Sequence, residues 1–420
     1  MVRLRQVLDQ VRHRLLFVPA LFTLGAVALA QVMLQLDAAL GDEDLPRTLQ
    51  TTVDSGRAIL SAIAGGLIAS ITLLLSLTMV AVQLASSQFS PRTVRNWIGD
   101  RTQQRSIGVV LGTTVYCLLV LRETRSLSEG DALTPHFSVI LAVILGIVSL
   151  IAVVRSVDHL TDKLRVGSIA TKLSNETIEL IHRSNESAAE SVGDTPVPLT
   201  KEDLAPPTDA FAIEARQMGW IQQIDTGSLL RSAPKGSTIY LPASVGEFVP
   251  ANAPLAWISP PPDDEDRCVA MREHFALGDT RTMQSDVGFG VLQMVDIALR
   301  ALSPGVNDPN TANDIVVHLG AVLLSLWESP LAADVTELDG RRLIQRRFVH
   351  EDHLDAALDP IRHHGVDEPL VAITLLRTLR LLESETLRRG LPGPIEPLRA
   401  MAGRIIAESS VTLADNTLPS

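Results

Sequence analysis

The chain has 420 residues, of which 46% are hydrophobic and 20% charged, and its formal net charge is −12. Residues 1–155 hold 13 arginines, no lysine and 10 acidic residues, a net charge of +3, so residues 156–420 carry −15. Such an acidic second part argues against nucleic acid as a partner, because phosphate binding requires a basic surface.

The two cysteines and the first apolar run restrict the class of protein further. Cys117 lies in an apolar run and Cys268 lies far beyond it. Because the two cysteines lie on different sides of the divide between the apolar and soluble parts, we expect no structural disulfide. No spacing typical of a zinc site is present, so we expect no metal site, and we expect no cofactor. The first apolar run exceeds the roughly 7–15 residues of a signal-peptide core, so we expect a span there and not a cleavable signal.

Four runs near the N-terminus contain no charged residue: 15–36, 58–91, 106–121 and 132–154. A helix needs about 20 apolar residues to cross roughly 30 Å of hydrocarbon, and a charge at the bilayer centre is costly. These runs predict a transmembrane domain over residues 1–155 with four helices, at about 15–36, 58–86, 105–121 and 134–154. The third run is short, so a re-entrant position stays open, whereas the second is over-long and should tilt or project.

Arginine counts alternate between the segments that flank these spans. Four arginines precede the first span and four lie between the second and third, whereas the other two connections are acidic or mixed. By the positive-inside rule, this alternation predicts that both termini are cytoplasmic.

The second run carries a polar stripe. Ser61, Gly65, Thr72, Ser76 and Gln83 fall close to one helical face. Small residues at this spacing allow helix backbones to approach closely, and hydroxyl groups can bond across the contact. Alternatively, the stripe lines a narrow hydrophilic path in an oligomer, where hydroxyl groups replace part of the hydration of an ion.

A helix start follows the second run. Ser90 as N-cap and Pro91 at the first helical position form a start signal, and Arg92, Arg95 and Trp97 suit the headgroup zone of a bilayer. The segment is either an interfacial anchor or a cationic vestibule at a pore mouth, which would favour anions.

No Asp, Glu, Lys or Arg falls in the middle of the four runs. Proton-coupled carriers and pumps usually need such residues as relays, so active transport is disfavoured. No set of nucleophile, base and orienting residue is recognisable, and we therefore do not expect an enzyme.

The rest of the chain predicts a cytoplasmic α+β part. Residues 156–183 have the spacing of a connecting amphipathic helix, and the proline-rich residues 184–210 predict a linker. Residues 211–259 alternate as strands do and predict a small β module. Residues 260–410 predict an α-helical domain and residues 411–420 a flexible tail.

Turn residues and apolar residues alternate every third position from Gly246 to Ile258. This spacing resembles the half-motif of biotinyl/lipoyl-like barrel-sandwich domains, with Asn252 where glycine is usual. Asparagine tolerates the left-handed backbone, so the replacement is mild. The carrier lysine flanked by methionines is absent, and the resemblance therefore implies a local fold without a covalently attached cofactor.

A loop in the helical domain has two interpretations. In the first, Gly305 ends one helix, Asp308 caps the next and Pro309 opens it. In the second, the oxygen atoms of Asn307, Asp308 and Asn310 ligate a hard cation such as calcium.

Three segments carry a wider resemblance: LASSQFSPR at 84–92, GTTVYCLLVLR at 112–122 and DIALRALSPGVNDP at 296–309. They are similar to segments of domain-of-unknown-function family 2254, a bacterial family of predicted membrane proteins. The resemblance spans nearly the whole chain and implies a multi-pass protein of the bacterial inner membrane. It implies no activity.

Together these patterns predict an oligomeric ion channel or passive pore, lined by the second span and governed by the cytoplasmic part. Its expected partners are the lipid bilayer and further copies of the chain. The alternative is a non-conducting, membrane-anchored sensor or scaffold whose cytoplasmic part binds a ligand or a protein.

Overall fold

The computed structural model describes residues 17–40, 52–88, 101–126, 135–163, 166–189, 205–262, 264–329, 335–345 and 350–409. The chain divides into two compact units, one of residues 4–165 and one formed mainly by residues 166–420. We call them the membrane unit and the C-terminal unit.

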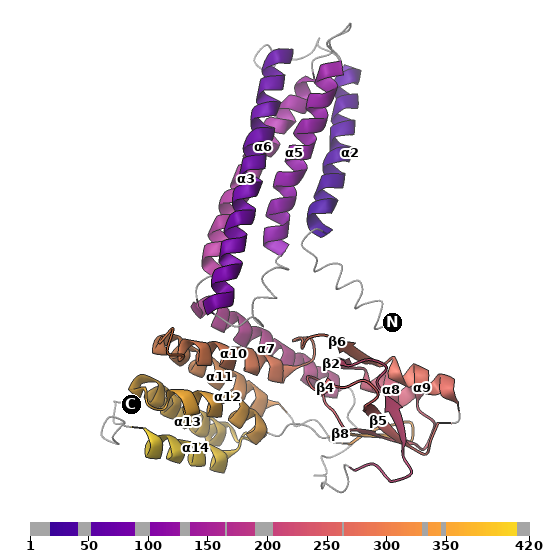
Figure 1. The fold of residues 1–420 in the computed structure, drawn as a ribbon, viewed down its shortest axis with the longest axis vertical. Coiled ribbons are helices and arrows are strands. Elements are labelled where there is room, and N and C mark those ends of the chain that lie inside the picture. Colours follow the sequence, from indigo (N-terminus) through magenta and orange to yellow (C-terminus); the bar gives the residue numbers. More distant parts are fainter. Residues whose placement is uncertain are drawn as a thin grey trace. The chain divides into compact units, whose positions relative to one another are not determined.

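Four long helices form the described part of the membrane unit (Figure 1): α2 (Phe17–Leu40), α3 (Val53–Gln88), α5 (Arg101–Ser126) and α6 (His136–Lys163). Each contains a window long and apolar enough to cross a membrane. The window in α5 is Thr102–Thr124, 23 residues of unbroken helix, or about 35 Å at 1.5 Å per residue. The short third run therefore belongs to a full-length helix, because polar residues at both ends extend it.

Helix α5 lies at the centre of the membrane unit and packs against each of the other three helices. Of its apolar window 56% is buried, against 17% to 28% for the other three. A helix surrounded by other helices needs fewer apolar side chains than one that faces lipid, because its neighbours can satisfy its polar groups. This position explains why the third run is the least apolar of the four.

Close glycine contacts hold α5 against α2. A Cβ atom at Gly108 would lie 2.9 Å from a ring carbon of Phe22, and one at Gly112 would lie 3.1 Å from the Phe22 carbonyl oxygen. Two glycines four residues apart form the small-residue motif that allows membrane helices to approach closely. The adjoining apolar core combines residues from all four helices: Ala26, Ala30, Leu60, Ala64, Tyr116, Cys117, Val120, Val139 and Ala142.

In the described residues, six helices form the helical part of the C-terminal unit: α7 (Val166–Ala189), α10 (Val287–Ala301), α11 (Pro309–Glu328), α12 (His350–Gly365), α13 (Pro369–Arg389) and α14 (Ile395–Glu408). The predicted connecting helix 156–183 corresponds to two elements, the end of α6 and α7. The apolar face of α7 is buried against α10 and α11. A Cβ atom at Gly290 of α10 would lie 2.3 Å from Thr177 Oγ1, so α7 belongs to the core of this unit.

Where the structure describes the chain, the β part of this unit has eight short strands and two helices: β1 (Phe211–Glu214), β2 (Gly219–Ile224), α8 (Thr226–Ser232), β3 (Thr238–Leu241), β4 (Phe248–Val249), β5 (Pro254–Ser259), α9 (Glu265–Arg272), β6 (Phe275–Gly278), β7 (Val335–Leu338) and β8 (Arg341–Gln345). One sheet has the order β1-β5-β3-β8-β7 and the other the order β4-β2-β6. All pairings are antiparallel except that of β3 with β8. The two sheets share one apolar core, with Ile213, Ile221, Ile239, Leu255, Ile258 and Leu343 at its centre.

The expected β module is present, but its extent differs from the prediction. Strands β6, β7 and β8 lie beyond residue 259, in the region expected to be helical. In the described residues both sheets are open and neither closes into a barrel. Asn252 has a φ of 64°, which confirms the left-handed turn predicted for it.

Candidate functional site

The predicted pore-lining residues share one face of α3. Ser61, Gly65, Thr72, Ser76 and Gln83 are all exposed in the protomer. The buried face of the same helix carries another set, Leu60, Ala64, Leu67, Leu74 and Ala81. The stripe is therefore turned away from the neighbouring helices, and its role as a pore lining stays a prediction.

Two hydroxyl groups of the stripe, those of Thr72 and Ser76, are satisfied within α3. Thr72 Oγ1 donates to the Ile68 carbonyl at 3.0 Å, and Ser76 Oγ donates to the Thr72 carbonyl at 2.9 Å. Such bonds to the preceding turn remove the need for a partner outside the helix. Each of these hydroxyl groups keeps an oxygen lone pair that points outward and can accept a hydrogen bond.

Gly65 and Gly66 have open space beside them. A Cβ atom added at either position would meet no atom within 4 Å, in contrast to Gly108 and Gly112 of α5. The α3 face can therefore accept another helix at close range without any change inside the protomer.

The polar groups inside the membrane unit come mainly from α5 and α6. Gln103 Nε2 donates to Thr78 Oγ1 of α3 at 2.9 Å, and Ser156 Oγ of α6 donates to Gln103 Oε1. Farther along the same pair of helices, Ser149 Oγ donates to Thr113 Oγ1 at 2.9 Å. These bonds join helices where side chains cannot reach water.

Sequence reasoning missed this inner set, because polar residues in the third run indicated only a weak span. The signal that could have found them is the recurrence of adjacent uncharged polar residues along one membrane helix. Polar side chains are unfavourable on a surface that faces lipid, so such residues indicate a buried helix face. Within the described residues, both Gln103 and Gln104 and the later pair Thr113 and Thr114 are buried.

Gln104 differs from its neighbour Gln103. Its side chain is fully buried, yet neither its amide oxygen nor its amide nitrogen has a hydrogen-bond partner among the described residues. An unpaired amide in a low-dielectric interior is unfavourable by about 1–3 kcal/mol. The two adjacent glutamines therefore affect the stability of the membrane unit in opposite directions.

Asp37 joins α2 to α6 at the other end of the membrane unit. Its carboxylate accepts hydrogen bonds from the Phe137 amide at 2.8 Å, the Ser138 amide at 3.1 Å and the Ser138 hydroxyl. It therefore caps the N-terminus of α6 from another helix. Tyr116 adds a bond from its hydroxyl to the Ser138 carbonyl at 3.1 Å.

The proposed membrane-interface residues Arg92, Arg95 and Trp97 lie outside the described residues. A small pocket beside the start of α6 is lined by Thr52, Val53, Gly56, Thr124, Pro135, His136 and Val139.

In the C-terminal unit, the capping interpretation of the loop before α11 is confirmed for Asp308 and Pro309 but wrong for Gly305, because α10 ends at Ala301 with Leu302 as its C-cap. Asp308 Oδ1 accepts a hydrogen bond from the Thr311 amide at 3.2 Å, and Pro309 is the first residue of α11. Asn307 has a φ of 48°, and Asn310 is exposed in the first turn. Cation binding by Asn307, Asp308 and Asn310 stays a prediction, and no cluster of three or more His, Cys, Asp or Glu in the described residues could hold a metal.

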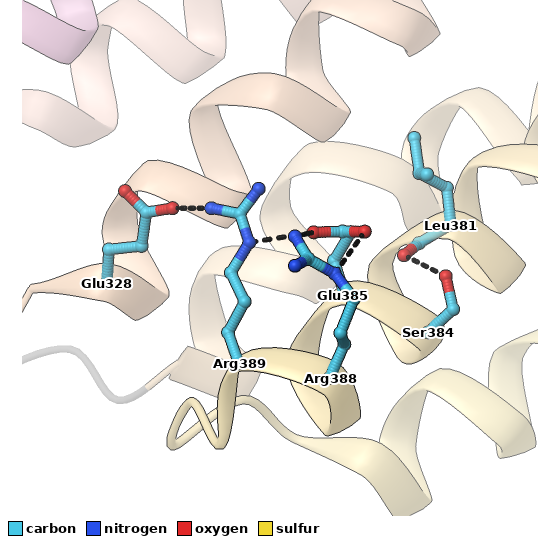
Figure 2. Close-up of polar contacts among 6 residues, drawn as sticks. All are labelled: Glu328, Leu381, Ser384, Glu385, Arg388 and Arg389. Atoms are coloured by element: carbon cyan, nitrogen blue, oxygen red, sulfur yellow. Dashed lines mark hydrogen bonds and ion pairs between the residues drawn. The ribbon is translucent and has the colours of Figure 1, made fainter.

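Ion pairs tie the helices of the C-terminal unit together on its surface. Figure 2 shows Arg389 between Glu328 of α11 and Glu385, with Arg388 on the same Glu385 carboxylate. Hydrogen bonds from Arg388 and Arg389 lower the pKa of Glu385 from 4.5 to about 2. Because these groups lie on the surface, we assign them to helix packing and not to a site.

Comparison with known proteins agrees with this architecture. Two uncharacterized proteins, from Mycobacterium bovis and Mycobacterium tuberculosis, are each 32% identical to the chain over 343 residues. The alignment covers 79% of this chain and 64% of each relative, so the chain spans less than two thirds of their length. No solved structure matches the chain. A family model described as predicted membrane protein matches residues 12–381, and the chain therefore belongs to domain-of-unknown-function family 2254.

Proposed function

We propose that this membrane protein is an oligomeric passive channel whose path is lined by α3 helices from several copies. The observation that carries the proposal is the outward stripe on α3, with open space beside Gly65 and Gly66. A pore on a shared axis requires a helix face that is small, polar and free of contacts within the protomer, and this face has all three properties.

The interior of a single protomer supports the same placement of the path. Leu60, Tyr116 and Val120 are fully buried in the apolar core of the membrane unit. Gln103, Thr113, Ser149 and Ser156 bond to one another or to Thr78 of α3, so these groups have little capacity left to hydrate a passing ion. A path between protomers needs no rearrangement of this core.

The chemistry of the stripe favours passive transport. It offers hydroxyl groups and backbone at glycine, and none of its five residues carries a charge. Such a lining can replace part of the hydration shell of an ion, whereas active transport usually needs titratable residues.

Control by the C-terminal unit follows from how α7 is held. Only two residues separate the end of α6 at Lys163 from the start of α7 at Val166. Gly290 leaves no room between α7 and α10, so α7 is fixed in the helical core of the C-terminal unit, and its short connection to α6 along the chain supports control by this unit.

Planar-bilayer recording of the purified full-length protein tests the proposal. The double substitution Thr72→Val and Ser76→Val should reduce single-channel conductance severalfold, because it removes both hydroxyl oxygen atoms from the lining. Thr23→Val on α2 is the matched control, since Thr23 Oγ1 donates in the same way to the Pro19 carbonyl at 2.9 Å. Absence of any conductance, or an equal effect of the control, would contradict the proposal.

The competing function is a non-conducting membrane anchor for a sensor or scaffold. One observation favours it: because the Thr72 and Ser76 hydroxyl groups bond within α3, the stripe can also face lipid. The mass of the protein in detergent separates the two functions. A channel requires a ring of copies, whereas an anchor can be a monomer.

We propose that the protein resides in the bacterial inner membrane with both termini cytoplasmic and that it is not an enzyme. The arginine distribution supports the orientation. Labelling of cysteines introduced at residues 45 and 415 with a membrane-impermeant reagent tests it. In intact spheroplasts, only the residue at position 45 should react.

A further inference from the structure

Three exposed arginines, Arg105, Arg122 and Arg155, lie within the apolar spans of the membrane unit, and two of them, Arg105 and Arg155, lie at the same end. Arg105 is three residues after the start of the window Thr102–Thr124, and Arg155 is six residues before the end of the window His136–Thr161. At 1.5 Å per residue, they lie about 4.5 Å and about 9 Å inside their spans.

The two arginines lie at nearly the same depth. Hydrogen bonds pair Gln103 with Ser156 and Tyr116 with Ser138, so α5 and α6 run antiparallel. Arg105 is two residues beyond Gln103, and Arg155 is one residue before Ser156. Both positions are therefore about 1.5–3 Å farther into the span than the hydrogen bond between Gln103 and Ser156.

They also lie on the same side of the α5–α6 pair. Gln103 bonds to Thr78 of α3 and to Ser156 of α6. Arg105 is two residues later, about 200° around α5, on the side of Gly112 and α2. Gly146 faces Ile63 of α3, and Arg155 is nine residues later, about two and a half turns around α6. Both arginines thus face away from α3.

The two side chains can reach a common partner. Packed helix axes are separated by about 8–10 Å, a distance that two extended arginine side chains can bridge. Neither guanidinium forms an ion pair or hydrogen bond with another residue in the described ranges. The neighbouring surface of α6 is apolar, with Val154 68% and Ile151 56% exposed.

We propose that Arg105 and Arg155 together bind the phosphate of an anionic lipid headgroup, in the leaflet at this end of the membrane unit. A guanidinium offers paired donors that match phosphate oxygens, and basic sites between membrane helices are suited to anionic headgroups. Snorkelling toward water would account for one arginine near a helix end, but it does not require two at one depth on one side. The exposed Val154 and Ile151 provide the apolar surface for the acyl chains of the lipid.

Titration of the delipidated full-length protein with short-chain phosphatidylglycerol, followed by native mass spectrometry, tests the proposal. Arg105→Gln and Arg155→Gln should each weaken binding about fivefold, and the double variant about 25-fold, because each basic residue near the surface contributes about 1 kcal/mol. Arg57→Gln is the matched control, since Arg57 lies near the start of α3, at the opposite end of the membrane unit. It should bind phosphatidylglycerol like the wild type.

Two further arms identify the source of the phosphate. Phosphatidylcholine should bind at least tenfold more weakly than phosphatidylglycerol, and millimolar inorganic phosphate should not displace the lipid. Wild-type affinity in the double variant, an equal loss in Arg57→Gln, or displacement by inorganic phosphate would each overturn the lipid site. Because both arginines are exposed and make no contact of this kind within the described residues, the variants should keep the elution volume of the wild type.

Discussion

Helices α3 and α5 belong to the same unit, and both carry small and polar residues. On α5 these residues face the neighbouring helices, whereas on α3 they lie on the exposed surface. Gly108, Gly112 and Gln103 of α5 face neighbouring helices, whereas Gly65 and Thr72 of α3 face outward. The composition of a membrane helix therefore does not reveal which surface its polar residues serve. On α5 they hold the helices of the membrane unit together, and on α3 they are exposed.

Matched glycine substitutions on α3 and α5 should show the largest difference in stability, and they test whether the two helices direct their small residues to different surfaces. Gly112→Val should lower the free energy of unfolding by about 1–3 kcal/mol, because its side chain would collide with the Phe22 backbone. Gly65→Val should change it by less than about 0.5 kcal/mol, because the site is open. Thermal denaturation in detergent measures both.

Gly65→Val should nevertheless reduce the mass of the complex if α3 is the contact between copies. Gly25→Val on α2 is the control, since Gly25 is also exposed with no atom within 4 Å of an added Cβ. Equal stability losses for Gly65→Val and Gly112→Val would show that both helices face inward.

Removal of the Asp37 cap is expected to have the next largest effect. Asp37→Ala leaves two amides and a hydroxyl at the start of α6 without their acceptor, and should lower stability by about 1–2 kcal/mol. Asp37→Asn keeps one carbonyl oxygen as acceptor and should lose less. The same denaturation assay measures the difference, and identical losses in the two variants would contradict the capping role.

The adjacent glutamines of α5 test whether an inward position alone makes a polar residue stabilising. Gln103→Leu should lower stability by about 1 kcal/mol, because Ser156 and Thr78 lose a partner. Gln104→Leu should raise it by a similar amount, because an unpaired amide is removed. A stability loss for Gln104→Leu would instead reveal a partner in the assembled protein.

The smallest effect is expected for an exposed polar contact in the C-terminal unit, as a contrast to the buried contacts of α5. The pKa of Glu385 falls from 4.5 to about 2 on folding, so its contribution to stability is present above pH 4.5 and is lost as the pH falls toward 2. Glu385→Gln should abolish this component and so lower stability at pH 7, only slightly because solvent screens the exposed pair. The difference from the wild type should shrink as the pH falls toward 2. Unfolding midpoints at about pH 5 and pH 3, on either side of the ordinary carboxyl pKa, measure it. If Glu385→Gln had the same pH dependence of stability as the wild type, the Glu385 carboxylate would not contribute to it.

Much of the membrane unit could be predicted from the sequence. The four spans are predictable because runs without charge have no other common explanation, and the α3 stripe is predictable because its residues repeat at helical spacing. The side to which the stripe points could not be predicted. Lipid is as apolar as a protein core. The helical spacing of polar residues in a membrane helix therefore does not show whether they face other helices or the lipid.

The C-terminal unit shows a different limit. The cap at Asp308 and the turn at Asn252 could be predicted because the responsible residues are local. Strands β7 and β8 were missed although the two residues between them, Asp339 and Gly340, form a hairpin signal. Their place in the sheet was not predictable, because β8 pairs with β3 about 100 residues earlier and single-sequence patterns carry no such long-range information.

That parallel pairing has a consequence for synthesis on the ribosome. Strand β3 lies between β5 and β8, so its second edge remains unpaired until residues 341–345 have emerged. At about 5–20 residues per second, the delay after β3 is roughly 5–20 s, during which α10 and α11 can form first. The nascent chain thus carries an unpaired sheet edge for seconds. We expect a chaperone to reduce aggregation most while the residues between 241 and 341 are being synthesised.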